Sequence, residues 1–84
     1  MNKQEIIDIL GFHTSWATRK VRISYGNGSY TFIAGEVSVW DDSVTVNATD
    51  LGEPMIGCTD AVVIPLENIK QIEKTSERIE ILCQ

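Results

Sequence analysis

The apolar residues of this chain change their spacing after about residue 18, and that change restricts its fold more than any other feature. Near the amino terminus, Ile6, Ile9 and Leu10 recur at the i, i+3, i+4 spacing of one helix face. From Val21 onward, apolar residues alternate with polar ones, which is the spacing of a half-buried strand. The sequence therefore predicts one short helix followed by a β-rich body.

The predicted helix has clear capping residues at both ends. Asn2 and Glu5 have the spacing of a capping box, in which each side chain accepts a hydrogen bond from the other residue's backbone N–H. Gly11 follows the last apolar residue of the stripe, where a left-handed cap favours glycine. We expect the helix to stop there and residues 12–18 to form a connection. So short a helix is not stable alone, and it must therefore pack against the strands.

Six stretches have the alternation or the continuous apolar run of a strand. A tight turn around Asn27-Gly28 joins the first two, because asparagine and glycine accept the positive φ of hairpin turns. Gly35 lies in the longest stretch and predicts a bend or a bulge there. The predicted strands cover residues 21–25, 30–40, 44–47, 61–64, 69–73 and 78–82.

These elements predict a mainly β protein with a short N-terminal helix, in the α+β class. We expect a small bent antiparallel barrel of five to six strands, with the helix across one open end. At this length, residues 1–84 form a single domain. The predicted core consists of Ile6, Leu10, Val21, Ile23, Ile33, Val37, Val39, Val44, Val46, Val63, Ile69 and Ile72.

This order of a short helix and bent strands resembles the Sm-like (LSm) family of small barrels, within the wider SH3-like group. The matching motifs cover roughly residues 2–73 and are Val21-x-Ile23-x-Tyr25, Gly35-Glu36-Val37-x-x-x-Asp41, Val44-Thr45-Val46 and Ile64-Pro65-Leu66-x-x-Ile69-x-x-Ile72. The resemblance implies a helix followed by five bent strands.

The residues that bind RNA in that family are not the ones found here. Thr45 stands where the family's first motif has asparagine, and Pro65-Leu66 replaces the Arg-Gly of the second motif. An additional strand after Glu73 is placed to cover the edge that such proteins use for ring assembly. The resemblance therefore implies the fold without uridine binding, and a fold alone does not define a function.

The charges are distributed unevenly along the chain. Seven basic against twelve acidic residues give a net charge of −5, and the stretch from Ile23 to Ile69 has seven acids and no Lys or Arg. Such a stretch repels phosphate, so nucleic-acid binding is not expected. It gives either a solvated acidic surface or a surface that meets a basic partner. An alternative nucleic-acid patch would consist of Arg19, Lys20, Arg22, Lys70, Lys74 and Arg78.

Neither a catalytic nor a metal site is predicted. Asp41 and Asp42 are adjacent and are typical of a hairpin turn, and His13 is the only histidine. Cys58 and Cys83 are not spaced like metal ligands. We expect no enzymatic activity, no cofactor and no metal. The N-terminal residues lack a signal-peptide pattern and no stretch is long enough to span a membrane, so we expect a cytoplasmic protein.

The expected function is a small acidic protein-binding module, of the adaptor or inhibitor type that phages and mobile elements encode. In a continuous strand over residues 30–40, three aromatic side chains and one acid share the outer face, and a loop tip adds an apolar contact. The candidate partner-binding residues are Tyr30, Phe32, Glu36, Trp40, Pro54, Met55 and Ile56. Burial of these aromatics in the core is the competing interpretation. The alternative functions are an Sm-like oligomeric RNA-binding protein and a self-assembling structural barrel, so a homo-oligomer is also an option.

Overall fold

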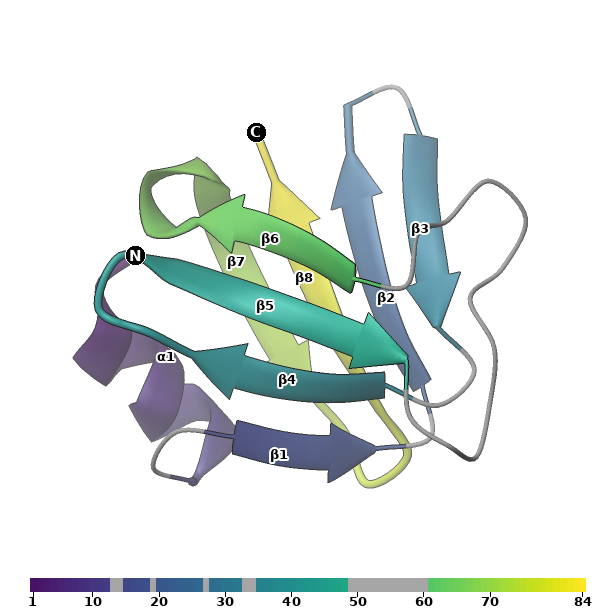
Figure 1. Cartoon of the computed structure of the whole chain (residues 1–84), viewed down its shortest axis with the longest axis horizontal. Coiled ribbons are helices and arrows are strands. Elements are labelled where there is room, and N and C mark those ends of the chain that lie inside the picture. Colours follow the sequence, from purple (N-terminus) through teal and green to yellow (C-terminus); the bar gives the residue numbers. More distant parts are fainter. Residues whose placement is uncertain (13–14, 19, 27, 33–34, 49–60) are drawn as a thin grey trace.

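The computed structural model describes residues 1–12, 15–18, 20–26, 28–32, 35–48 and 61–84. It contains one helix and two four-stranded sheets (Figure 1). The elements are α1 Lys3–Leu10, β1 Ser15–Thr18, β2 Lys20–Tyr25, β3 Gly28–Phe32, β4 Gly35–Val39, β5 Ser43–Ala48, β6 Ala61–Pro65, the 3-10 helix η1 Leu66–Asn68, β7 Ile69–Lys74 and β8 Arg78–Cys83.

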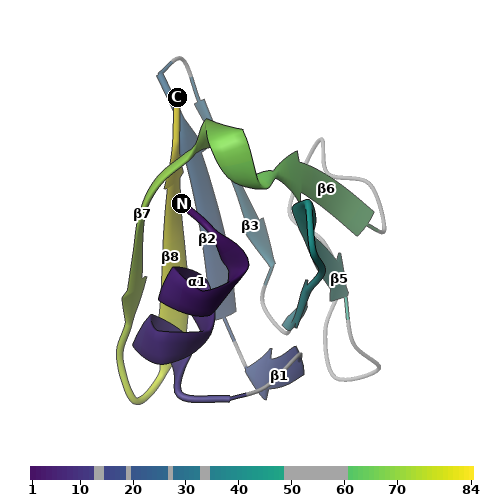
Figure 2. The ribbon, with the colours of Figure 1, turned by 90° about the vertical axis from the view of Figure 1, so that its left-hand side faces the viewer.

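The two sheets lie one behind the other, with strands that cross steeply (Figure 1). The front sheet has the strand order β1-β4-β5-β6, and the back sheet has the order β3-β2-β8-β7. Figure 2 shows them as two layers, with α1 beside the gap at one open side. The helix contacts β4 of the front sheet and β7 of the back sheet. The mainly β architecture with one N-terminal helix is thus confirmed.

The capping residues define the helix as predicted. The Glu5 N–H donates to Asn2 Oδ1 at 2.8 Å, and the Asn2 N–H donates to Glu5 Oε1 at 3.1 Å. Gly11 has a φ of 76°, and its N–H donates to the Ile7 carbonyl at 2.7 Å. The buried side of the helix consists of Ile6 and Leu10. Because both ends are capped by local residues, the helix needed no tertiary information to be predicted.

The back sheet contains one pairing that the sequence analysis did not anticipate. β2 and β3 form the predicted hairpin, in which Tyr25 faces Gly28. β8, however, pairs with β2 in parallel, and Val21 lies opposite Ile79. All other pairings are antiparallel. The arrangement is thus mainly antiparallel, as predicted, with one parallel pair that arises because β8 lies between β2 and β7 and runs antiparallel to β7.

The predicted strand over residues 30–40 is two strands in different sheets. β3 ends at Phe32 in the back sheet, and β4 begins at Gly35 in the front sheet. In one continuous strand, Phe32 and Val37 would face opposite ways. Because they belong to strands of different sheets, both are fully buried. The prediction that Phe32 lies on the outer face is therefore wrong.

The strand count and the strand pairing also differ from the prediction. Eight strands are described where five to six were expected, because residues 30–40 divide and residues 15–18 form β1 rather than a connection. β1 pairs along β4, from Ser15 opposite Ser38 to Thr18 opposite Gly35. Within the described residues, the pairings give two separate sheets and no closed barrel.

The space between the two sheets holds the core. Ten of the predicted core residues are buried: Ile6, Leu10, Val21, Ile23, Val37, Val39, Val44, Val46, Ile69 and Ile72. Val63 is 63% exposed, and its neighbour Ile64 is buried instead. The continuous apolar run of β6 did not reveal which of its residues point inward. Ile33 lies outside the described residues. The core also includes Phe32, Ile64, Leu66, Ile79, Ile81 and Cys83.

Candidate functional site

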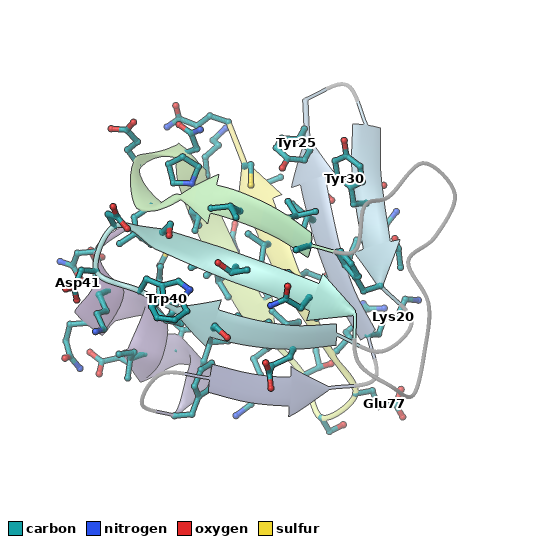
Figure 3. The ribbon with its side chains drawn as sticks, viewed as in Figure 1. Lys20, Tyr25, Tyr30, Trp40, Asp41 and Glu77 are labelled. Atoms are coloured by element: carbon teal, nitrogen blue, oxygen red, sulfur yellow. The ribbon has the colours of Figure 1, made fainter. Side chains whose placement is uncertain are left out.

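The predicted partner-binding residues do not lie on one face. Tyr30 is half-buried on β3 and Phe32 is buried, both in the back sheet, whereas Glu36 and Trp40 are exposed on the front sheet. Figure 3 shows Tyr30 and Trp40 on opposite sides of the molecule. The third predicted component, residues 54–56 with Pro54, Met55 and Ile56, lies outside the described residues. Among the predicted residues that the structure describes, only Glu36 and Trp40 share a face.

That common face is the solvent-facing side of the front sheet, which we call the front face. Its residues alternate with buried ones on β4, β5 and β6, and the cross-strand registers Ser38–Thr45–Val63 and Glu36–Asn47–Ala61 align them in rows. The face consists of Glu36, Ser38, Trp40, Ser43, Thr45, Asn47, Ala61, Val63 and Pro65. Glu36 is the only charged residue in this set.

Trp40 is held in place although it is 56% exposed. Its indole Nε1–H donates to Thr45 Oγ1 at 3.1 Å, and its backbone N–H donates to the Ser43 carbonyl at 2.8 Å. The second bond closes the β4–β5 turn, and the first orients the ring toward β5 (Figure 3). Val63 is the other large apolar side chain exposed on this face. The sequence analysis selected Trp40 but missed Val63 and Thr45, which only the strand registers bring near it.

The opposite side of the molecule, the solvent-facing side of the back sheet, has a different character. Lys20 lies opposite Arg78, and Arg22 lies opposite Glu80 on the parallel strands β2 and β8. Glu80 is 3.9 Å from Arg22 Nη1 and 3.8 Å from Arg78 Nη2. On the next strand, Glu73 faces Glu80. On this back face, the positive charges of Lys20, Arg22 and Arg78 are therefore partly offset by the negative charges of Glu80 and Glu73.

The alternative nucleic-acid patch is only partly assembled. Lys20, Arg22 and Arg78 share the back face, and Lys70 is exposed on β7. The Lys74 ammonium donates to the Leu10 carbonyl at 2.8 Å, at the C-terminal end of α1, where a cation is favourable. Arg19 lies outside the described residues.

Beside Trp40, the front face continues into an open acidic hollow of about 660 Å³. Its carboxylates come from α1, the β4–β5 turn and η1. Glu5 accepts the capping-box hydrogen bond, and Asp41 lies 3.0 Å from Lys3 Nζ. The exposed side chains of Asp42 and Glu67 have no ion-pair partner among the described residues. The residues that line the hollow are Met1, Asn2, Glu5, Asp41, Asp42, Pro65, Leu66 and Glu67.

A second hollow, of about 430 Å³, lies at the end of the β2–β3 hairpin. Tyr25 and Tyr30 line it with their rings edge to face, 5.8 Å between centroids. Burial raises the pKa of Tyr25 above its ordinary value, and nearby Cys83 and Tyr30 raise it further. Burial also raises the pKa of Cys83. Both side chains are therefore held in their neutral forms.

No metal site is found in the part of the chain that the structure describes: it holds no group of three or more His, Cys, Asp and Glu side chains suited to a metal ion. His13 and Cys58 fall outside that part, so the expectation that neither is functional stays a prediction. No helix in the described ranges is long and apolar enough to cross a membrane.

A scan against protein-family models and searches of curated proteins and of solved structures found no match. The resemblance to Sm-like proteins therefore stays a prediction.

Proposed function

We propose that this protein is a protein-binding module that docks through the front face. The observation that carries this proposal is an exposed tryptophan, held by a hydrogen bond, on a sheet face with a single charged side chain. Aromatic residues dominate the binding energy of many interfaces, and charged residues are depleted at interface centres. Because Thr45 already restricts the ring of Trp40, binding immobilises little that was free.

The contrast between the two sheets also favours this face. The front-sheet strands contain no lysine or arginine, whereas the back face has five charged side chains. Burying that back face would require desolvation of ion pairs such as Arg22–Glu80. A partner that covers the front face would remove Trp40 and Val63 from water and would desolvate a single charged side chain, Glu36.

The proposal includes a non-catalytic, cytoplasmic role, of the adaptor or inhibitor type known from phages and mobile elements. The acidic composition supports it. No cofactor is required for such a role.

Two surface variants test the docking face. Trp40→Ala removes the proposed anchor, and Leu82→Ala removes a side chain that is 41% exposed on the back face. The wild-type protein and both variants are immobilised and exposed to lysate of the source cells, and retained proteins are quantified by mass spectrometry. We expect a protein that wild type and Leu82→Ala retain and that Trp40→Ala loses. Equal retention by all three, or loss from Leu82→Ala alone, contradicts the proposal.

The second candidate is an Sm-like barrel that assembles and binds RNA. Its support is the order of a helix before bent strands and the grouping of Lys20, Arg22 and Arg78 on one face. It predicts micromolar, salt-sensitive binding to uridine-rich RNA, and a sedimentation coefficient above that of a 9.4 kDa monomer. Self-assembly without RNA binding would point to a purely structural barrel. We expect no RNA binding, because Glu80 lies within 3.9 Å of both Arg22 and Arg78 and reduces the positive charge of this group.

A further inference from the structure

We infer that the partner's docking segment is cationic: a lysine or arginine side chain enters the acidic hollow while a neighbouring apolar side chain packs on Trp40. This inference rests on the proposed function, and it adds the chemistry of the partner. It comes from the position of the hollow, which is continuous with the front face.

The continuity arises at the ends of two strands. Asp41 and Asp42 directly follow Trp40 in the turn to β5, and both line the hollow. Pro65 belongs to the front face through its register with Ser43, and it also lines the hollow. A partner segment that lies across Trp40 therefore reaches the carboxylates without leaving the surface.

Charge complementarity determines the sign of the partner. Of the four carboxylates at the hollow, Asp41 is paired with Lys3, and Glu5 is engaged by the helix cap. Met1 also lines the hollow, and its ammonium group, which donates to the carbonyl of Leu66 at 3.2 Å, reduces but does not cancel the excess of carboxylates. The exposed carboxylates of Asp42 and Glu67 are left to face solvent.

The surrounding field reinforces this local excess of negative charge. All of β4, β5, β6 and η1 lies in the stretch from Ile23 to Ile69 that has no Lys or Arg, and the chain has a net charge of −5. A second copy of this chain that docked through the same face would present the same acidic residues and would be repelled. A basic segment would be steered toward the hollow, since complementary charge increases association rates.

The test uses a random-peptide phage library, so that the chemistry of the ligand is not imposed. The library is selected on wild-type protein, and each recovered peptide is then tested for binding to Trp40→Ala. We expect the peptides that depend on Trp40 to combine Lys or Arg with large apolar residues. Trp40-dependent peptides without cations would overturn this inference and leave the proposed function standing. If no selected peptide depends on Trp40, both fail.

The recovered basic peptides are then titrated against acid-removing variants. Asp42→Asn with Glu67→Gln should weaken binding about three- to tenfold at low ionic strength, and high salt should abolish the difference. Glu73→Gln is the matched control, because it removes one exposed carboxylate from the back face and should leave affinity unchanged. Equal affinity of the double variant and wild type would overturn the role of the hollow.

Discussion

Replacing Gly35 by alanine tests the passage of the chain from one sheet to the other. A Cβ at Gly35 would lie 2.9 Å from Val21 Cγ2 and 3.3 Å from Phe32 Cβ. The first distance is shorter than carbon atoms tolerate without a shift. Val21 is fully buried and β-branched, so it has little freedom to rotate away. We therefore expect Gly35→Ala to push β4 and β2 apart.

The expected size follows from two opposing effects. Overpacking of a dense core destabilises by about 1–3 kcal/mol. The same substitution reduces the freedom of the unfolded chain, which stabilises by about 0.5–1 kcal/mol relative to glycine in a strand. The difference between the middles of these ranges is a net loss of about 1 kcal/mol in free energy of unfolding, which lowers the melting temperature of a domain of this size by about 4–8 °C.

Urea unfolding followed by circular dichroism measures this loss, and a second substitution tests its cause. Val21→Ala removes the nearest atom, so Gly35→Ala should be less destabilising in that background, by about 1 kcal/mol. Gly26→Ala is the control, since a Cβ there meets nothing within 4 Å. If Gly35→Ala is as stable as wild type, or if the two losses simply add, the close approach is not the reason for this glycine.

Three further predictions concern the core and the hairpin end. Phe32→Ala should reduce the free energy of unfolding by about 3–5 kcal/mol in urea titrations. A loss under about 1 kcal/mol would contradict the burial of Phe32. Val37→Asp should prevent folding, visible as a lost β-sheet circular-dichroism signal, because an unpaired carboxylate in the core costs several kcal/mol. The melting temperature should fall in alkali, because the raised pKa values of Tyr25 and Cys83 contribute stability that is fully present only below their ordinary values of 10.0 and 9.0. That stability is lost as the pH rises through the raised pKa values. Tyr25→Phe should flatten this alkaline slope, and an unchanged slope would show that Tyr25 does not contribute.

Features set by near neighbours in sequence were predictable. The helix follows from residues within four positions of each other, namely Asn2 with Glu5 and Gly11 with Ile7. The β2–β3 hairpin follows from its short turn, and ten core positions follow from the helical or strand spacing of the apolar residues. In each case the physical cause is a local hydrogen bond or a periodic pattern.

Features set by distant partners were not predictable from the same patterns. Nothing local specifies that β8 pairs with β2, or that it does so in parallel. Alternation also continues through residues 30–40 as if they were one strand, although the chain changes sheets before Gly35. The assignment of Tyr30, Phe32, Glu36 and Trp40 to one face failed for this reason. Of these four, only Glu36 and Trp40 lie on one face, because both follow the change of sheet.

The unpredicted parallel pairing is also what separates the charges of the molecule. Six of the seven basic residues lie at positions 19–22 and 70–78, at opposite ends of the sequence. The pairing of β2 with β8 brings these ends side by side in the back sheet, where Lys20 faces Arg78. The cation-free stretch between them includes β4, β5 and β6, three of the four strands of the front sheet, together with β3 and the end of β2 in the back sheet. The front-sheet strands therefore carry no lysine or arginine, and Trp40 is exposed on the face that they form.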